Sequence, residues 1–440
     1  MRTIETRYDP FAREKVRVTG LMKQRLVRRL LSVVGTLVTG IALQSLQSAA
    51  AHDQIPGPPQ TRPILISGAT VHVIDGKTLD GGSVLVEKGK ITAVGKSITA
   101  PKNALRIDAR GKHLYPGLIE SITDLGLREI SAVEETDDRT EFGSLNPNVR
   151  SWIAVNPDSE LIPVARAGGV LAVMTAPRGR WVRGQSAVLQ LDGWTPQEMS
   201  LLAPAGLYVD WSATQSRDDD EKKWAENREE KLKELDDLLE DARRYGEARE
   251  AKPAVTPTDI RLESLLPVIA GERPLIAEAQ RQSTIESAVA YAQSQGLKLV
   301  IQGGYDAADC AELLRRYDVP VIIGSTYRLP LRRDDPYDAP FTLPSRLHQA
   351  GVHFAIAGAG AGAPGGAANA RSLPYHAGIA VAYGLSPDVA LRSITLSAAE
   401  ILGVADQIGS ITVGKDATLI LTDGDILETN THVTEAFIQG

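Results

Sequence analysis

The sequence predicts an α/β protein made of a (β/α)8 TIM barrel and a small β-sandwich domain built from both chain ends. In residues 113–408, short apolar, β-branched runs alternate with helix-like stretches, which indicates βα units and a parallel sheet. In residues 64–112 and 409–440, apolar and polar residues alternate between glycine-rich turns, which is typical of short antiparallel strands. The central runs match the eight strands of a barrel: 113–119, 169–176, 186–193, 206–211, 273–279, 297–303, 319–325 and 352–358.

A highly charged segment, residues 216–252, separates the fourth and fifth of these runs. Acidic and basic residues recur three or four positions apart, as they do on helix surfaces. The pattern predicts a long, solvated helix on the outside of the barrel, with a partner-binding helix as the alternative. Its leucines are spaced as on one face of a helix: Leu232, Leu235, Leu238 and Leu239.

Composition narrows the class of partner. Of the 440 residues, 43% are hydrophobic and 23% are charged, and the net charge is -7 without a basic stripe. This balance disfavours nucleic acid, DNA included, and an anionic membrane surface, so a small-molecule ligand is the expected partner. The single cysteine, Cys310, follows helix-like sequence and is interpreted as a buried structural thiol.

The N-terminus has the layout of an export signal. From Met22 the chain has several basic residues, an apolar run over 30–43 and small residues at 49–51. The run is shorter than the about 20 residues of a membrane-spanning helix. We therefore assign residues 1–51 to a signal-peptide region and 52–63 to a linker, and predict an exported (periplasmic or secreted) protein. A natural start at Met22 and an N-terminal membrane anchor are the open alternatives.

Four stretches carry a resemblance to a known family. They are "ISGATVHVIDG…GSVLVEKGKITAVG", "YPGLIE" at the first barrel strand, "LPYHAGIAVAYGLSPDVAL", and "ALRSITLSAAEILGVADQIGSITVGKDATLILTDGDIL". Together they resemble the amidohydrolase superfamily, in the branch similar to imidazolonepropionase and related cyclic-amide hydrolases. The resemblance spans nearly everything after residue 64.

The resemblance implies a metal-dependent hydrolase of non-peptide C–N bonds. Members hold one or two divalent ions, such as zinc, iron or manganese, at the C-terminal face of the barrel, where the ions activate a water. The usual ligands are two histidines on the first strand, often a carbamylated lysine on the fourth, histidines on the fifth and sixth, and an aspartate on the eighth. That aspartate also acts as the general acid and base.

This chain departs from that pattern at almost every ligand. No histidine occurs between residues 114 and 347, so a histidine-built centre of the family type cannot form, and no cofactor is predicted with confidence. The fourth predicted strand contains no lysine. The positions that the resemblance assigns to ligands hold Ile122, Asp124, Glu278, Gln302 and, on the eighth strand, Gly358 or Ala359.

Other polar residues are expected at the barrel mouth. Asp124 and Glu278 would face one cavity and could form an acid/base pair or hold a hard cation. The alternative is a hydrogen-bonded polar network without catalysis. The predicted pocket residues are Gln302, Tyr305, Tyr327, Arg371 and His376.

Three loops are expected near the mouth. Residues 175–187 carry Arg178, Arg180 and Arg183, which could bind a carboxylate or phosphate group, although a plain solvated loop is the alternative. Residues 358–375 are rich in glycine and alanine. Residues 328–341 are interpreted as a lid from their position and proline content.

Two functions remain open from the sequence. One is a hydrolase of C–N bonds in cyclic amides or similar small molecules, with a lost or much altered metal centre. The other is a catalytically inactive binding protein, or a subunit paired with an active homologue; a homo-oligomer is also open. Fold alone does not decide between them.

The signal peptide gives a direct prediction. Cleavage after the small residues should leave a mature protein that begins at or after Ala49. N-terminal sequencing of protein recovered from the native host checks this, and mature chains that retain residues before Ala49 would contradict cleavage there.

Overall fold

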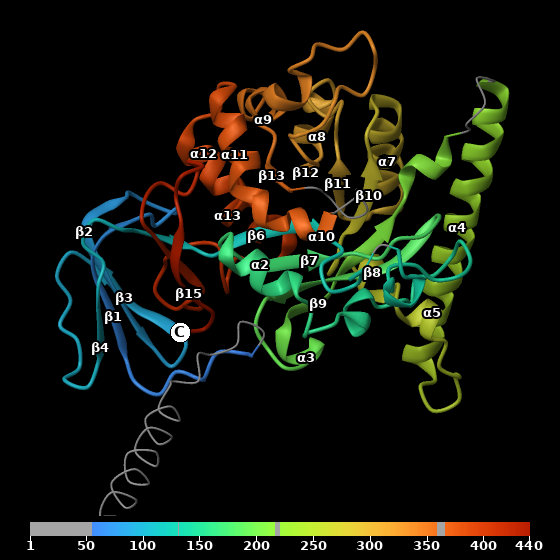
Figure 1. Cartoon of the computed structure of the whole chain (residues 1–440). Coiled ribbons are helices and arrows are strands. Elements are labelled where there is room, and N and C mark those ends of the chain that lie inside the picture. The colour runs from blue at the N-terminus through green and yellow to red at the C-terminus, as the bar shows by residue number, and fades with distance from the viewer. Residues whose placement is uncertain (1–54, 131, 216–220, 359–365) are drawn as a thin grey trace, which may run out of the picture. The chain divides into compact units, whose positions relative to one another are not determined.

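The computed structural model describes residues 55–130, 132–215, 221–358 and 366–440 (Figure 1). The predicted signal-peptide region lies outside the described residues, as do Ala359 and the following residues up to 365. Residues 56–440 form one compact unit that contains two β-sheets. Of the described helices, none is both long and apolar enough to cross a membrane.

The first sheet takes strands from both ends of the chain. Its order is β15-β14-β5-β1-β2-β3, with β4 paired to β1 as a branch. The pairs β1–β2, β2–β3, β5–β14 and β14–β15 are antiparallel, whereas β1 runs parallel to β4 and β5. The strands are β1 (Ile64–Val71), β2 (Leu79–Glu87), β3 (Lys90–Gly95), β4 (Leu105–Asp108), β5 (His113–Pro116), β14 (Leu419–Thr422) and β15 (Val433–Phe437).

This sheet has its own apolar core. Buried residues of the N-terminal strands, such as Ile66 and Val84, share one cluster with Leu419 and Leu421 from the C-terminal end. The sequence expectation of a β unit made from both chain termini therefore matches the strand pairing. Hydrogen bonds join these strands into one branched sheet rather than into two separate ones.

The turn at Pro116-Gly117 leads from this sheet into the barrel. The backbone N–H of Gly117 donates to the carbonyl of Thr418 at 2.9 Å, and the next strand begins at Leu118. A Cβ at Gly117 would lie 2.8 Å from Leu171, so only glycine fits the close approach. The glycine of the family-like "PG" is thus required by packing.

The second sheet is the barrel, and it confirms a TIM-barrel fold with an added β domain. Its eight strands follow the order β13-β12-β11-β10-β9-β8-β7-β6. They are β6 (Leu118–Thr123), β7 (Val170–Thr175), β8 (Val182–Gln190), β9 (Ser200–Val209), β10 (Leu275–Ala279), β11 (Leu299–Gly303), β12 (Val321–Ile323) and β13 (Phe354–Ile356).

One strand departs from the expected parallel pattern. β8 runs antiparallel to both β7 and β9. A parallel return needs a crossover of about a dozen residues or more, and residues 176–181 cannot supply one. The other connection, from β8 to β9, holds only the short helix α3 (Pro196–Met199). The start of β8, rather than its end, therefore lies beside the C-terminal end of β9, where Val182 pairs with Val209.

Helices cover the outside of the barrel, and apolar side chains fill its interior. Ile122, Met174, Tyr208, Ile276 and Val300 pack in one inner cluster. Cys310, before α8, is buried as predicted. The remaining helices are α2 (Leu161–Ala167), α4 (Glu221–Ala251), α5 (Ile260–Glu263), α6 (Leu266–Ile269), α7 (Gln282–Gln295), α8 (Ala311–Arg316), α9 (Ala339–Gln349), α10 (Gly366–Asn369), α11 (Leu373–Ala382), α12 (Pro387–Ser393) and α13 (Leu396–Leu402). Four short 3-10 turns complete the set: η1 (Glu134–Thr136), η2 (Ser151–Ala154), η3 (Trp211–Thr214) and η4 (Ala370–Ser372).

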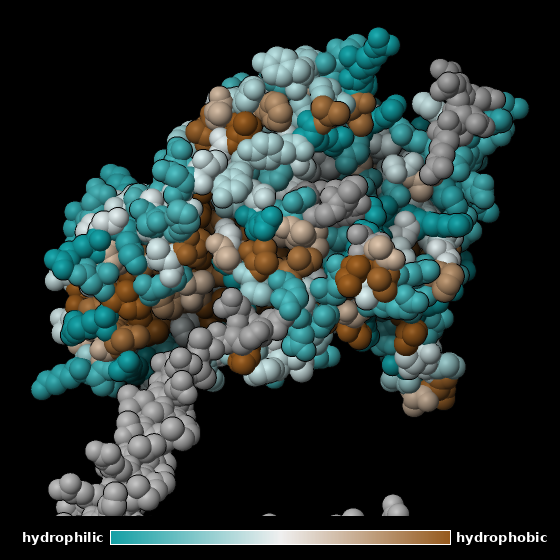
Figure 2. Space-filling view, in the orientation of Figure 1, coloured by the Kyte–Doolittle hydropathy of each residue, from teal (hydrophilic) through white to brown (hydrophobic). Residues whose placement is uncertain are grey.

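The charged segment forms the long helix α4, as predicted. Leu235, Leu238 and Leu239 are buried on one side, and the helix packs on η3, α5 and α6. The side of α4 that faces the viewer in Figure 2 is mostly hydrophilic. The helix is amphipathic, so packing along its leucine face, rather than ion pairing alone, holds it in place.

A buried carboxylate spans the seam between the first and last barrel strands. The hydrogen-bonded order of the described strands ends at β6 and β13, without a ladder between them. Glu120 of β6 accepts hydrogen bonds from the backbone N–H of Gly358, just after β13, at 2.8 and 3.0 Å. Burial raises the pKa of Glu120 to about 8, against the opposing effect of these N–H donors. At neutral pH the seam is therefore held mainly by a protonated carboxyl.

Replacing Glu120 with Gln tests this seam. The folded pKa of about 8 lies above the ordinary 4.5, so the folded protein keeps a proton that the unfolded chain releases. Wild-type stability should therefore fall as pH rises from about 5 to about 8, by on the order of 4 kcal/mol. Glu120→Gln cannot ionise and should lack this loss.

Thermal unfolding followed by circular dichroism at about pH 5 and about pH 9 checks this expectation. The Glu120→Gln variant should gain stability relative to wild type at the higher pH. Glu229→Gln, an exposed substitution on α4, is the matched control and should follow wild type. Identical pH dependence in Glu120→Gln and wild type would mean that this carboxyl does not hold its proton in the fold.

Candidate functional site at the barrel mouth

The first barrel strand brings two of the expected positions to the mouth, and one of them is apolar. Ile122 is 1% exposed and packs in the inner barrel cluster beside Met174. It therefore completes the apolar barrel interior and offers no ligand atom. Asp124, just after the strand, is also buried.

Asp124 is held by an arginine from the following loop. Its Oδ2 accepts from Nη1 of Arg139 at 3.0 Å, and its Oδ1 has no hydrogen-bond partner among the described residues. The same guanidinium donates through Nε to Asp137 at 2.6 Å and also through Nη2. These bonds hold the pKa of Asp137 below its ordinary value. One arginine thus serves two carboxylates at this edge of the mouth.

Glu278 is held in the same way by a second arginine. Nη1 of Arg183, on β8, donates to Glu278 of β10, and Nη2 donates to Asp210 at 2.6 Å. Arg183 is 9% exposed, and its Nε donates to the carbonyl of Gly179 at 3.2 Å. Its two carboxylates raise the pKa of this guanidinium against the effect of burial. A fixed positive charge therefore stands between two carboxylates at the mouth.

Gln302 joins this cluster through a tyrosine. The hydroxyl of Tyr208 donates to Oε1 of Gln302 at 2.9 Å, and the guanidinium of Arg183 lies 5.4 Å from the centre of the Tyr208 ring. Complete burial raises the pKa of Tyr208 well above its ordinary value, so its hydroxyl stays protonated as a donor. The polar network that the sequence left as an alternative is present from β8 to β11.

The residues present do not fit the family's metal centre. Zinc, iron and manganese sites need imidazole, thiolate or free carboxylate ligands. Here Ile122 is apolar, and Asp124 and Glu278 are each bound to a guanidinium whose charge would repel a metal ion. Within the described ranges, no three His, Cys, Asp or Glu side chains are grouped so that they could hold a metal ion. No step through a metal ion is derived for this chain.

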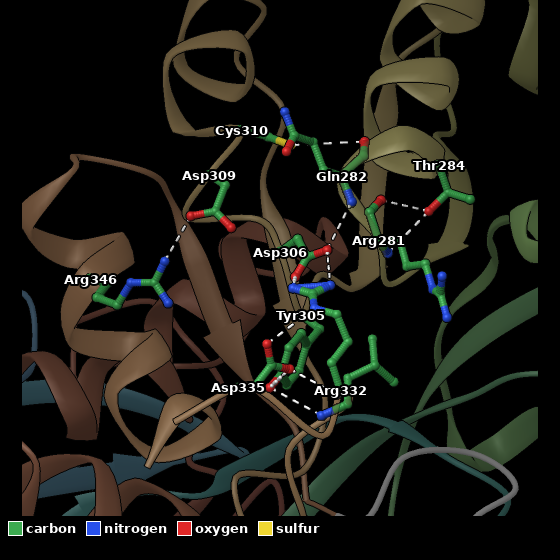
Figure 3. Close-up of polar contacts among 11 residues, drawn as sticks. Arg281, Gln282, Thr284, Tyr305, Asp306, Asp309, Cys310, Arg332, Asp335 and Arg346 are labelled. Atoms are coloured by element: carbon green, nitrogen blue, oxygen red, sulfur yellow. Dashed lines mark hydrogen bonds and ion pairs between the residues drawn. The ribbon is translucent and has the colours of Figure 1, made fainter. Parts of the chain in front are cut away.

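Tyr305 anchors the loop that was interpreted as a lid. Its hydroxyl donates to Asp335 at 2.8 Å and accepts from the backbone N–H of Leu331 at 3.1 Å. Arg332 of the same loop donates to Asp306 at 2.7 and 2.9 Å, as Figure 3 shows. Tyr305 therefore fixes the loop after β12. Tyr327, at the start of that loop, is about half exposed.

His376 and Arg371 have different surroundings from those expected. His376, on α11, is buried, and its Nδ1 accepts from the backbone N–H of Thr326 at 3.2 Å. Burial lowers the pKa of His376 to about 4, so the ring is neutral and fixes the loop after β12. Arg371 is exposed, and its backbone packs on Gly168, which precedes β7 and so lies at the strand end away from the mouth.

The sequence did not identify Arg139 and Asp210 as residues of this site, nor the pairing of Arg183 with two carboxylates. Arg183 was seen only as part of a loop, because the third strand was expected to begin at residue 186 and to run parallel to its neighbours. The shortness of residues 176–181 was the available signal. Arg139 lies in a loop without periodicity, so no pattern placed it beside Asp124.

Comparison with known proteins agrees with the fold. The amidohydrolase family pattern matches residues 164–439. The amidohydrolase tasK of Hapsidospora irregularis is 22% identical over 401 residues, which are 82% of this chain and 39% of that protein. The chain thus spans about two fifths of the length of this curated relative.

Solved structures give the same result. An amidohydrolase from Thermotoga maritima MSB8 superposes with a TM-score of 0.75 at 27% identity, covering 86% of this chain and 98% of that one. A molinate hydrolase superposes with a TM-score of 0.54 at 16% identity, over 86% of this chain and 94% of that one, and shares the fold. Because the family pattern covers more than half of its residues, this chain belongs to the amidohydrolase family, and these two relatives are hydrolases by name.

Arg183 and its two carboxylate partners, Glu278 and Asp210 (the Arg183 cluster), give a prediction about stability. Arg183→Met keeps most of the side-chain volume but leaves Glu278 and Asp210 without their shared cation, which should cost about 3 kcal/mol. Chemical denaturation measures this loss. Arg180→Met, which removes an exposed arginine of the same loop, should change stability by less than about 0.5 kcal/mol.

A double variant separates charge from packing. If unpaired charge causes the loss, adding Glu278→Gln to Arg183→Met should restore part of the stability, because one uncompensated carboxylate is then removed. Additive losses in the double variant would instead attribute the effect to packing of the arginine stem.

Proposed function

We propose that this amidohydrolase-family protein binds a small molecule at its barrel mouth without metal-dependent hydrolysis. One observation carries the proposal: the carboxylates at the mouth that could serve a metal, Asp124 and Glu278, are each paired with an arginine. A guanidinium is a permanent cation that cannot lower the pKa of a bound water as a metal ion does. The cluster suits recognition of polar groups better than water activation.

A second candidate is hydrolysis of a C–N bond in a cyclic amide without a metal. The observation that favours it is Oδ1 of Asp124, which has no hydrogen-bond partner in the part of the chain that the structure describes and which Arg139 orients through the other oxygen. A carboxylate held in this way could take a proton from water in a bound complex. The amidohydrolase from Thermotoga maritima MSB8, which is 27% identical, is a hydrolase by name and supports this candidate.

We also propose that the protein is exported. The three-part layout of residues 22–51 supports this, and the periplasm or the medium is the expected location. An N-terminal anchor remains the alternative form of the same proposal.

Metal analysis combined with turnover assays tests the first two proposals together. Protein produced with zinc, iron and manganese in the medium should retain, after dialysis, far less than one ion per chain. It should also show no chelator-sensitive hydrolysis of a panel of cyclic amides and dipeptides. Stoichiometric metal with turnover that a chelator abolishes would overturn the first proposal.

The same assay separates the second candidate. Turnover that survives the chelator and is lost in Asp124→Asn would favour metal-independent hydrolysis. Asp137→Asn is the matched control, because Asp137 binds the same arginine from outside the barrel strands. Equal loss of turnover in both variants would indicate that Arg139 alone had been displaced.

A further inference from the structure

A pocket with three arginines lies beside the Arg183 cluster. It has a volume of about 490 Å3 and lies between the loop around Thr140–Gly143 and the loop Arg178–Arg180, with Arg183 at its edge. Arg183 follows the first residue of β8, which pairs with the last residue of β9. The pocket is therefore at the C-terminal face of the barrel, next to the paired carboxylates.

The guanidinium groups of two of these arginines are not held by hydrogen bonds or ion pairs among the described residues. The guanidinium of Arg183 is bound to Glu278 and Asp210. The side chains of Arg178 and Arg180 have no hydrogen bond or ion pair with any residue in the described ranges. The one acidic residue that lines the pocket, Glu141, accepts from the backbone N–H of Phe142 at 2.9 Å. Two guanidinium groups are thus available to an anion.

The backbone of the arginine loop is fixed. The N–H of Arg178 donates to the carbonyl of Arg139 at 2.7 Å, and Arg178 forms a parallel bridge with Thr140. Arg139 also binds Asp124, so the loop is tied to the end of the first barrel strand. The backbone that carries the two arginines is therefore already ordered, and a ligand has to order only their side chains.

An exposed aromatic ring completes the pocket. Phe142 lines it and is 95% exposed. A large apolar side chain that lies almost fully in water beside guanidinium groups gains by covering its ring with an apolar ligand surface. The charges and the ring together favour a ligand with an acidic end and an apolar body.

We propose that this pocket binds a small organic anion, with its acid group between Arg178 and Arg180 and its apolar or aromatic body on Phe142. Guanidinium groups recognise carboxylate and phosphonate oxygens through paired N–H donors. The inference rests on the proposed binding function and names the class of ligand for it.

Calorimetric titration of the purified protein tests the proposal with four probes: benzoate, phenylphosphonate, benzamide and inorganic phosphate. Benzoate or phenylphosphonate should saturate one site per chain. Benzamide, which has the ring without the charge, and phosphate, which has the charge without the ring, should bind at least about tenfold more weakly. Added salt should weaken binding of the acids. Tighter benzoate or tighter phenylphosphonate binding identifies the preferred acid group.

Single and double variants show which residues of the pocket bind the probes. Arg178→Gln and Arg180→Gln should each weaken benzoate binding by about tenfold, and the double variant should abolish it. Phe142→Ser should weaken benzoate and leave phosphate unchanged. Arg228→Gln, which removes an exposed arginine on α4, is the control and should bind like wild type. Thermal unfolding of each variant confirms that it is folded.

Three outcomes would overturn the proposal: no saturable binding of any probe, benzamide binding as tight as benzoate, or benzoate binding that survives in the double arginine variant. Failure of the binding function itself is seen in a different measurement. Stoichiometric metal with chelator-sensitive turnover would overturn that function. The benzoate titration would still show, independently, whether the pocket binds an organic anion.

Discussion

The arrangement of the mouth depends on the short connections at both ends of β8. Because residues 176–181 cannot form a crossover, β8 returns antiparallel to β7 and brings Val182 and Arg183 back to the C-terminal face. A helix in that connection would have reversed β8 and moved Arg183 away from Glu278. The position of the Arg183 charge at the mouth thus follows from the shortness of these two connections.

The consequence is that the carboxylates Asp124 and Glu278 at the mouth are each paired with an arginine of the protein. Arg139 joins Asp124 to Asp137, and Arg183 joins Glu278 to Asp210. Arg183 and Asp124 are buried and their partners are partly buried, so loss of one partner leaves a poorly solvated charge, and the arginines and the carboxylates constrain each other. The apolar Ile122 agrees with this arrangement, because a metal-ligating side chain at that position would have no metal ion to bind.

The sequence predicted the barrel, the added β domain, α4 and the positions of Ile122 and Asp124 at the first strand. These features depend on local periodicity and on glycine positions such as Gly117, and both can be recognised in a single sequence. The partners of the mouth residues depend on loop paths, which leave no periodic signal. For that reason Arg139 and Asp210 were not foreseen, and Arg371, expected near the pocket, packs by its backbone on Gly168 instead. His376 and Tyr305 were predicted to line the pocket, and in the structure their hydrogen bonds serve the loop after β12.

The carboxyl of Glu120 connects closure of the barrel to the proton concentration of the solvent. In the closed barrel its pKa is about 8, and the ordinary value is 4.5. At neutral pH, any motion that separates β6 from β13 and admits water must therefore release a proton. Opening of the barrel therefore releases a proton to the buffer. In a buffer of high ionisation enthalpy, calorimetry would detect this opening as heat even where no ligand is bound.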